Sequence, residues 1–388
     1  MEKNLAPSLR RRDVLLAIAG STLFVPAFSG QASPRIPPER WVSAHGGDVE
    51  DFGLGWIGSG KLGGNAATGF RGHAVIKHPL RSDSFLFLPG WPFNTAFDFD
   101  LSTGAVLQRI DSEQDRHFFG HGCFSSDGST LFTTEAEISA GLGRITVRDS
   151  STYALLDEWS SFGIGPHDMA DQPDGKTLVV ANGGILTRPE SGRKALNLPT
   201  MSSSLCYLDA SSGMLIDEFF VDEPKASIRH LDVATDGTVA FAIQVQRGAA
   251  GHNRLVPLIG AHRPGSALEL FSEPEAITLQ LNDYVGSVAI ANESGLAGYA
   301  SPRGNIVVFF DLSSGTLAGY HQLRDVCGIA VSAARRAFVI SNSFGEMREL
   351  DWSTLRERRE KRLRLPQIRW DNHLLITSAK HTAHKHTA

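Results

Sequence analysis

The sequence predicts an all-β protein, a seven-bladed β-propeller, and three observations lead to that fold. The 388-residue chain contains 39 glycines and 22 phenylalanines and is 41% hydrophobic, which is typical of a turn-rich β protein with a large core. Short apolar runs are joined by Asp-Gly turns, the local signal of a β-hairpin. These units recur at intervals of about 50 residues, as propeller blades do.

Each repeat has the same order of parts: a polar or glycine-containing entry, an apolar strand, a turn, a second apolar strand, and a third strand that ends in Asp. The clearest copy runs from Gly120 through the turn at Asp127 and Gly128 to Asp149. Six copies are visible, with first strands that start near His73, Gly120, Pro166, Arg229, Gly286 and Gly328.

The seventh blade is predicted to combine the two ends of one domain that spans residues 33–376. We expect the strand around residues 372–376 to join early strands around residues 54–57, because this closure removes an exposed sheet edge. A pair of β-sandwiches is the alternative fold, but it fits the repeat poorly. Residues 353–365, rich in arginine, are predicted to form a helix with a solvated charged face; the alternative is a docking patch for an acidic partner or membrane surface.

The first 32 residues are predicted to be a cleaved export signal. Three arginines at positions 10–12 precede Asp13 and an apolar run that is too short to span a membrane. Residues 11–15, RRDVL, resemble the twin-arginine motif of the pathway that exports folded proteins. We therefore expect a periplasmic mature protein without a membrane span; an uncleaved N-terminal anchor is the alternative.

The charge balance and the cysteine count exclude two classes of protein. The chain has 37 Lys and Arg against 42 Asp and Glu, so it lacks the basic excess of a duplex-binding protein, and no nucleic-acid partner is expected. Its three cysteines, Cys123, Cys206 and Cys327, are too few for a disulfide-dense scaffold or a four-cysteine zinc site.

Aligning the repeats on their first strands places a histidine at one position in five of the seven blades. In a propeller these strands line the central channel, and alternate side chains point into it. Converging imidazoles bind transition metals, so we predict an iron or copper site, with zinc as a further candidate. The alternative is that each ring bonds a nearby carbonyl. The predicted ligands are His73, His121, His167, His230 and His373, and the other two blades have Ser287 and Gly328.

Polar residues near these positions are predicted to support the metal ligands from a second layer. They are His117, Glu135, Asn182, Arg229, Gln244 and Asn372. The tail of residues 377–388 contains His381, His384 and His386, and we expect it to be either a separate metal-scavenging segment or an inert terminus.

Several motifs carry a resemblance to a known family. They include HFFGHG at 117–122, GIGPHD at 163–168, SIRHL at 227–231, SPRGN at 301–305 and WDNH at 370–373. The chain resembles a family of twin-arginine-exported bacterial propellers of unknown function, which accompany imelysin-type periplasmic iron-uptake proteins. Its fold resembles the β-chain propellers of quinoprotein amine dehydrogenases and YVTN-type propellers. The resemblance implies the fold, the compartment, a link to iron acquisition and an imelysin-type partner, but no activity.

Three functions remain open from the sequence. The first is metal handling on the channel histidines, and the second is a redox or hydrolytic enzyme that uses the metal. The third is a metal-free scaffold that binds partners on its rim. Calcium-dependent lactonase chemistry is disfavoured because calcium prefers oxygen ligands, and no Gly-x-Ser-x-Gly nucleophile motif is present. No catalytic residue is assigned.

Overall fold

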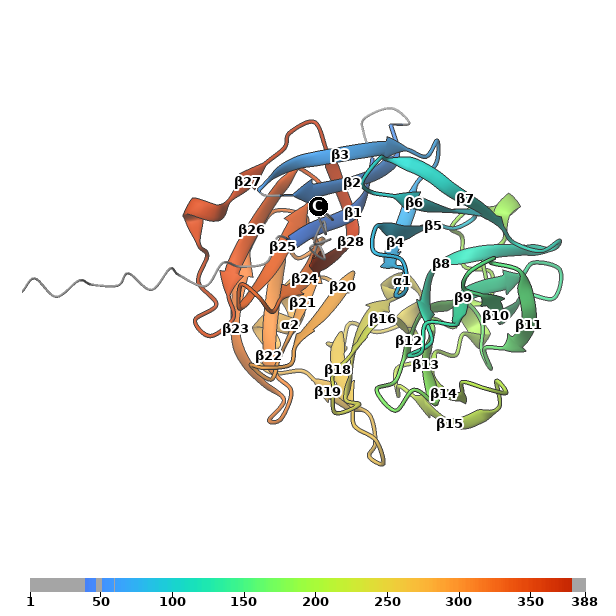
Figure 1. Ribbon diagram of the computed structural model, residues 1–388. Helices are drawn as coiled ribbons and strands as arrows, with labels where there is room; N and C mark the ends of the chain where they lie inside the picture. The colour runs from blue at the N-terminus through green and yellow to red at the C-terminus, as the bar shows by residue number, and fades with distance from the viewer. Residues whose placement is uncertain (1–38, 47–50, 59, 379–388) are drawn as a thin grey trace, which may run out of the picture. The chain divides into compact units, whose positions relative to one another are not determined.

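The computed structural model describes residues 39–46, 51–58 and 60–378, and these form seven four-stranded antiparallel sheets around a central axis (Figure 1). The fold is therefore the predicted seven-bladed β-propeller. The expected signal at residues 1–32 and the tail histidines lie outside the described residues.

The first three blades follow the chain order. The first contains β4 (Gly72–Lys77), β5 (Ser84–Pro89), β6 (Thr95–Asp100) and β7 (Ala105–Asp111). The second contains β8 (Arg116–Phe124), β9 (Thr130–Glu137), β10 (Leu142–Asp149) and β11 (Leu155–Ser160). The third contains β12 (Pro166–Asp171), β13 (Thr177–Asn182), β14 (Ser204–Asp209) and β15 (Leu215–Phe220).

The next three blades continue in the same way. The fourth contains β16 (Ala226–Val233), β17 (Val239–Val245), β18 (Ile259–His262) and β19 (Glu269–Phe271). The fifth contains β20 (Ser287–Ala291), β21 (Leu296–Ser301), β22 (Ile306–Asp311) and β23 (Thr316–Gln322). The sixth contains β24 (Val326–Ser332), β25 (Ala337–Asn342), β26 (Glu346–Asp351) and β27 (Leu363–Arg364).

The seventh blade joins the two ends of the domain, as predicted. Its order is β28 (Arg369–Ser378), β1 (Glu39–Gly46), β2 (Gly53–Gly58) and β3 (Lys61–Ala67). The C-terminal strand β28 pairs with β1. The early strand around residues 54–57, β2, pairs with β1 on its other side and is thus one strand further from the axis than we expected. The strands β4, β8, β12, β16, β20, β24 and β28 contact their neighbours in a closed ring and form the wall around the axis.

Local chemistry explains why the repeat is so regular. The glycines of three Asp-Gly turns, Gly128, Gly175 and Gly237, have φ of +74°, +62° and +86°, which a residue with a side chain adopts at a cost. The Asp that ends a third strand caps the next turn. The Asp149 carboxylate, for example, accepts bonds from the hydroxyls and the backbone N–H groups of Ser151 and Thr152. These bonds lower the pKa of Asp149 to about 2.

Aromatic side chains pack between neighbouring blades. Phe271 of β19 stacks on Phe310 of β22 with ring centroids 5.4 Å apart, and Phe309 contacts Phe338 of β25 at 4.8 Å. The outermost strands are instead largely exposed to solvent, as in β7, where Ile110 is the only buried residue. The buried blade interfaces hold the inner strands in a rigid ring, which positions the site described below.

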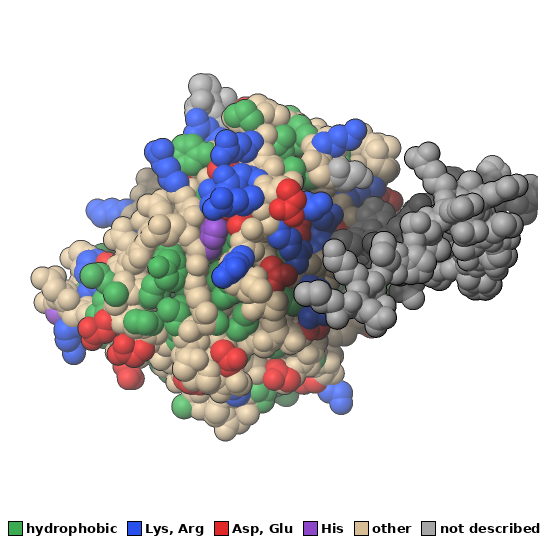
Figure 2. Space-filling model, turned by 90° about the vertical axis from the view of Figure 1, so that its left-hand side faces the viewer, with side chains coloured by type: hydrophobic (Ala, Val, Ile, Leu, Met, Phe, Trp, Pro, Cys, Tyr) green, Lys and Arg blue, Asp and Glu red, His purple; other side chains and the backbone are tan. Residues whose placement is uncertain are grey.

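The predicted helix at residues 353–365 is wrong. The chain there forms a 3₁₀ turn, Arg359–Lys361, and the short strand β27, because it returns to complete the sixth blade. Arg358 pairs with Asp351 at 2.7 Å and Arg362 with Glu357 at 2.7 Å. Figure 2 shows basic side chains gathered with acidic ones on this face of the molecule. The arginines thus form local ion pairs in place of a continuous helical face.

The other helical segments of the described residues are short connections: the α-helices α1 (Arg247–Ala250) and α2 (Glu275–Gln280), and the 3₁₀ turns η1 (Pro189–Ser191) and η2 (Leu198–Thr200). No helix among the described residues has the length and apolarity needed to cross a membrane.

Candidate metal centre and its pocket

Four of the inner strands each bring one histidine to the axis. His73 comes from β4, His121 from β8, His230 from β16 and His373 from β28, and one nitrogen of each lies within 4.8 Å of the others. The His73, His121 and His373 rings are mutually close, with centroids 4.5–4.7 Å apart. The structure therefore gathers four of the five predicted ligands into a group that could hold a metal ion.

Irregular strand register occurs at each of these histidines, and also in β12 and β24, which add no ligand to the group. The ladders of β4, β8, β16 and β28 all shift at or beside the histidine, whereas β20, which carries Ser287, has a regular register. A bulge changes the direction in which a side chain points. Gly120 adds room: its φ is +105°, and a Cβ there would lie 2.6 Å from Cδ2 of His73.

One ring nitrogen of each histidine in the group, Nε2, lacks a partner, which is unusual for buried polar atoms. The Nε2 atoms of His73, His121, His230 and His373 are buried and have no hydrogen-bond partner among the described residues. Leaving such atoms unpaired costs about 1–3 kcal/mol each. Four histidines that each place a nitrogen within 4.8 Å of the others, and each have an unpaired nitrogen, fit a bound cation better than four independent structural rings.

One ring is held by a carboxylate that the sequence analysis did not assign. Nδ1 of His121 lies 2.8 Å from Oδ1 of Asp168, and Oδ2 of Asp168 accepts a bond from the Leu231 backbone N–H at 3.1 Å. An Nδ1–H that donates to the carboxylate leaves the Nε2 lone pair free for a metal. Asp168 directly follows a predicted ligand in the motif PHD, and this was the available signal.

Burial favours the neutral form of three rings in the group. Burial, followed by the charge that neighbouring rings would carry, lowers the pKa of His73, His230 and His373 well below its usual value. For His167, burial and then the nearby Arg229 guanidinium have the same effect on the pKa. Neutral imidazole is the form that binds a metal.

His167, the fifth predicted ligand, lies beside the group and is not a member of it. In the third blade Asp168 pairs with Ala181, and in the fourth blade His230 pairs with Ala242 at the corresponding place in the ladder. Asp168 is therefore the counterpart of His230, and the predicted alignment on His167 is one residue out of register. The His167 ring is 4.7 Å from that of His230, and its Nδ1 faces Nη2 of Arg229 at 3.4 Å.

The predicted supporting residues have other contacts. Glu135 accepts bonds from Thr133 and Arg148, and Asn182 donates to the Ser161 carbonyl at 2.7 Å. Neither contact involves a ring of the group.

The other supporting residues lie at or near the mouth of the site. Asn372 donates to the Tyr284 hydroxyl at 2.9 Å, and Gln244 and Arg229 line the pocket described next. His117 packs edge-on against Trp91 at 5.7 Å, and burial lowers its pKa to about 4.

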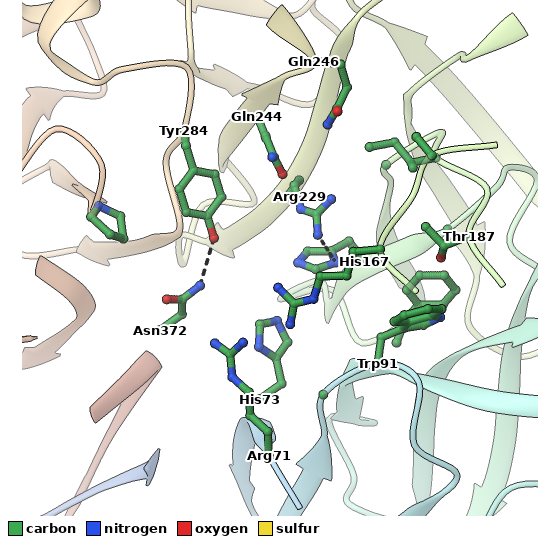
Figure 3. A pocket seen from close by; sticks show the side chains of 18 of the residues that line it. Arg71, His73, Trp91, His167, Thr187, Arg229, Gln244, Gln246, Tyr284 and Asn372 are labelled. Atoms are coloured by element: carbon green, nitrogen blue, oxygen red, sulfur yellow. Dashed lines mark hydrogen bonds between the residues drawn. The ribbon is translucent and has the colours of Figure 1, made fainter. Parts of the chain in front are cut away.

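A pocket of about 510 Å³ opens next to the histidine group. His73 and His167 line it, and Figure 3 shows both with Arg71 and Arg229, while Trp91 and Tyr284 lie on different sides. Arg193 and Arg303 also line it. Arg229 and Arg303 belong to motifs noted in the sequence, but no pattern there indicated that these four arginines share a pocket, because they come from different blades.

Comparisons with known proteins agree with the fold. The hydrazine synthase of Kuenenia stuttgartiensis has a similar structure, with a TM-score of 0.57, 13% identity, and 81% of this chain and 90% of that chain covered. At this identity the likeness shows the fold alone. A search of curated proteins finds no match. The model of a family described as a protein of unknown function, DUF1513, matches residues 66–377, so this chain belongs to the DUF1513 family.

Proposed function

We propose that the protein is a periplasmic metal-binding propeller that holds iron or copper on His73, His121, His230 and His373 and acts in metal acquisition. The observation that carries the proposal is the group of four buried, unpartnered Nε2 atoms on four inner strands. They lie on a rigid ring of strands, so little ordering entropy would oppose binding.

The donor set favours transition metals. Imidazole nitrogens suit copper, iron and zinc, whereas calcium and magnesium need oxygen ligands. Asp168 holds the His121 ring in the orientation that presents Nε2. Four histidines already provide most positions of a metal coordination sphere, which supports holding the ion more than turning over a substrate on it.

A metal-dependent enzyme is the second candidate, and the adjoining pocket favours it. The pocket reaches His73 and His167, so a small molecule there would lie beside the ion. For this function, only three of the four histidines would bind the ion. One coordination position would then stay open for a substrate or water, as catalytic metal sites require. A metal-free scaffold accounts less well for the unpaired nitrogens.

The compartment and the partner are proposed from the sequence. Residues 11–15 resemble a twin-arginine motif, and that pathway carries folded proteins, so a metal bound before export would travel with the protein. The resemblance to propellers that accompany imelysin-type iron-uptake proteins supports iron and a partner of that type.

Elemental analysis of protein purified from the periplasm tests the metal proposal. We expect about one equivalent of a transition metal in the wild type and less than about a tenth in His121→Ala/His230→Ala, because two ligands are lost. His252→Ala is the control, since His252 bonds Glu223 at 2.8 Å outside the group. Circular dichroism checks folding. A folded wild type that stays metal-free after reconstitution with copper, iron and zinc would contradict the proposal.

A further inference from the structure

The pocket beside the histidines carries positive charge that no acid balances. Arg193, Arg229 and Arg303 line it, and none of them has a carboxylate partner among the residues that the structure describes. Arg71, the fourth arginine, differs because it forms a two-pronged ion pair with Asp371 at 2.6 and 2.9 Å. Three guanidinium groups around one cavity produce a strongly positive potential inside it.

Arg229 is the most enclosed of the three. Its Nε is buried without a partner, and its Nη2 faces only the His167 ring, as Figure 3 shows. A buried guanidinium that has no anionic partner among the described residues is costly to the fold. An anion between the three arginines would remove that cost.

The remaining walls favour an organic ligand over an inorganic ion. Trp91, Phe119 and Ile185 provide an apolar side, and the volume of about 510 Å³ far exceeds that of a phosphate or sulfate ion. The Trp91 Nε1–H is buried without a partner. The Tyr284 hydroxyl accepts from Asn372, and no described residue accepts its proton, so it too has a bond left to donate.

We infer that this pocket binds a small organic anion, a carboxylate with an aromatic or apolar body. The carboxylate pairs with Arg229, Arg193 and Arg303, whose planar groups match its geometry. The body packs against Trp91 and Phe119. The pocket also touches His73 and His167, so a second carboxylate would reach a metal on the histidine group; this last step rests on the proposed function.

Calorimetric titration of the metal-free protein with phthalate, an aromatic dicarboxylate, tests the arginine site by itself. We expect saturable 1:1 binding, and at least about tenfold weaker binding in Arg193→Gln/Arg303→Gln, which removes two charged donors at the exposed rim. Arg356→Gln, an exposed arginine outside the pocket, is the matched control and should bind like the wild type. Phthalamide, with the same body and no charge, should not bind.

Three results would overturn the inference. The first is the absence of saturable phthalate binding by the folded wild type, and the second is equal binding by the double arginine variant. The third is tighter binding of inorganic phosphate than of phthalate, which would make the pocket an inorganic oxyanion site. Copper loading should strengthen phthalate binding in the wild type and leave it unchanged in His121→Ala/His230→Ala. If the metal-free protein binds phthalate but copper has no effect, the arginine site stands and the metal contact is wrong.

Discussion

Nδ1 of His121 on β8 lies 2.8 Å from Oδ1 of Asp168 on β12, so a carboxylate of the third blade orients a candidate metal ligand of the second. The same carboxylate accepts the backbone N–H groups of Met169 and of Leu231 in the fourth blade. Asp168 thus connects three blades at the level of the histidines. Such a contact fixes the tautomer of the ring and raises the basicity of the nitrogen that binds the metal.

Replacing Asp168 by Asn should weaken metal binding by about 10–100-fold without unfolding the protein, because the ring loses its carboxylate partner. Competition with a chromophoric chelator measures the affinity. Asp174→Asn, in the exposed turn after the same strand, is the control. Unchanged affinity in Asp168→Asn would show that this carboxylate has only a structural role.

Gly120→Ala should lower metal affinity by displacing a ligand. The new Cβ would lie 2.6 Å from Cδ2 of His73, at a φ of +105°. Gly265→Ala is the control for backbone strain without displacement of a ligand, because φ there is +78° and no atom lies within 4 Å of the new Cβ. Both variants should lose stability by about 1 kcal/mol from strain. Equal metal affinity in the two variants would contradict the proposed position of His73.

The metal-free protein should become less stable as the pH falls. The folded-state pKa of His73, His167, His230 and His373 lies below the usual 6.5, so the unfolded chain binds more protons below that pH. Their contribution is complete above 6.5 and is lost as the pH decreases below it. Asp232, with a pKa raised to about 6 by burial, acts in the opposite direction, as do Glu135 and Asp171, whose pKa burial also raises. These carboxyls are outnumbered by the histidines whose pKa burial lowers, which include His45 and His117 outside the site.

Thermal unfolding between about pH 7.5 and pH 5 measures this dependence. The melting temperature should fall with pH, and the slope should be shallower in His230→Gln, which removes one of the four groups. Metal should raise the melting temperature at neutral pH. At a free metal concentration of 100 times Kd, binding should add about 2.7 kcal/mol to the free energy of unfolding. A melting temperature that rises steadily from pH 7.5 to pH 5 in metal-free protein would show that these rings are not kept neutral by the fold.

Replacing Arg11 and Arg12 by Lys should block export, because the twin-arginine pathway reads the paired arginines and not the charge alone. Fractionation of cells that express the full-length protein, followed by immunoblotting, checks this. The precursor should accumulate in the cytoplasm, and Lys3→Arg is the control. Normal periplasmic amounts of the double lysine variant would instead indicate the general secretory route.

Local patterns were enough to predict the blades. Asp-Gly turns need only their own residues to form, and the alternation of apolar side chains places each strand between two blades. The closure of the seventh blade followed from the same reasoning. The prediction of a helix at the arginine-rich residues 353–365 was wrong. The local preference for a helix is overridden by ion pairs such as Arg358 with Asp351, and by the sixth blade, which takes its fourth strand from this segment.

The sequence by itself determined the seven-bladed fold and the presence of histidines on the inner strands. Only the tertiary structure decided that His167 lies beside the group of four histidines and that Asp168 bonds His121, because these contacts cross from one blade to another. It also decided that Arg193, Arg229 and Arg303 share one pocket. Residues on separate blades meet only when the ring closes, and no local pattern records the angle at which each strand then faces the axis.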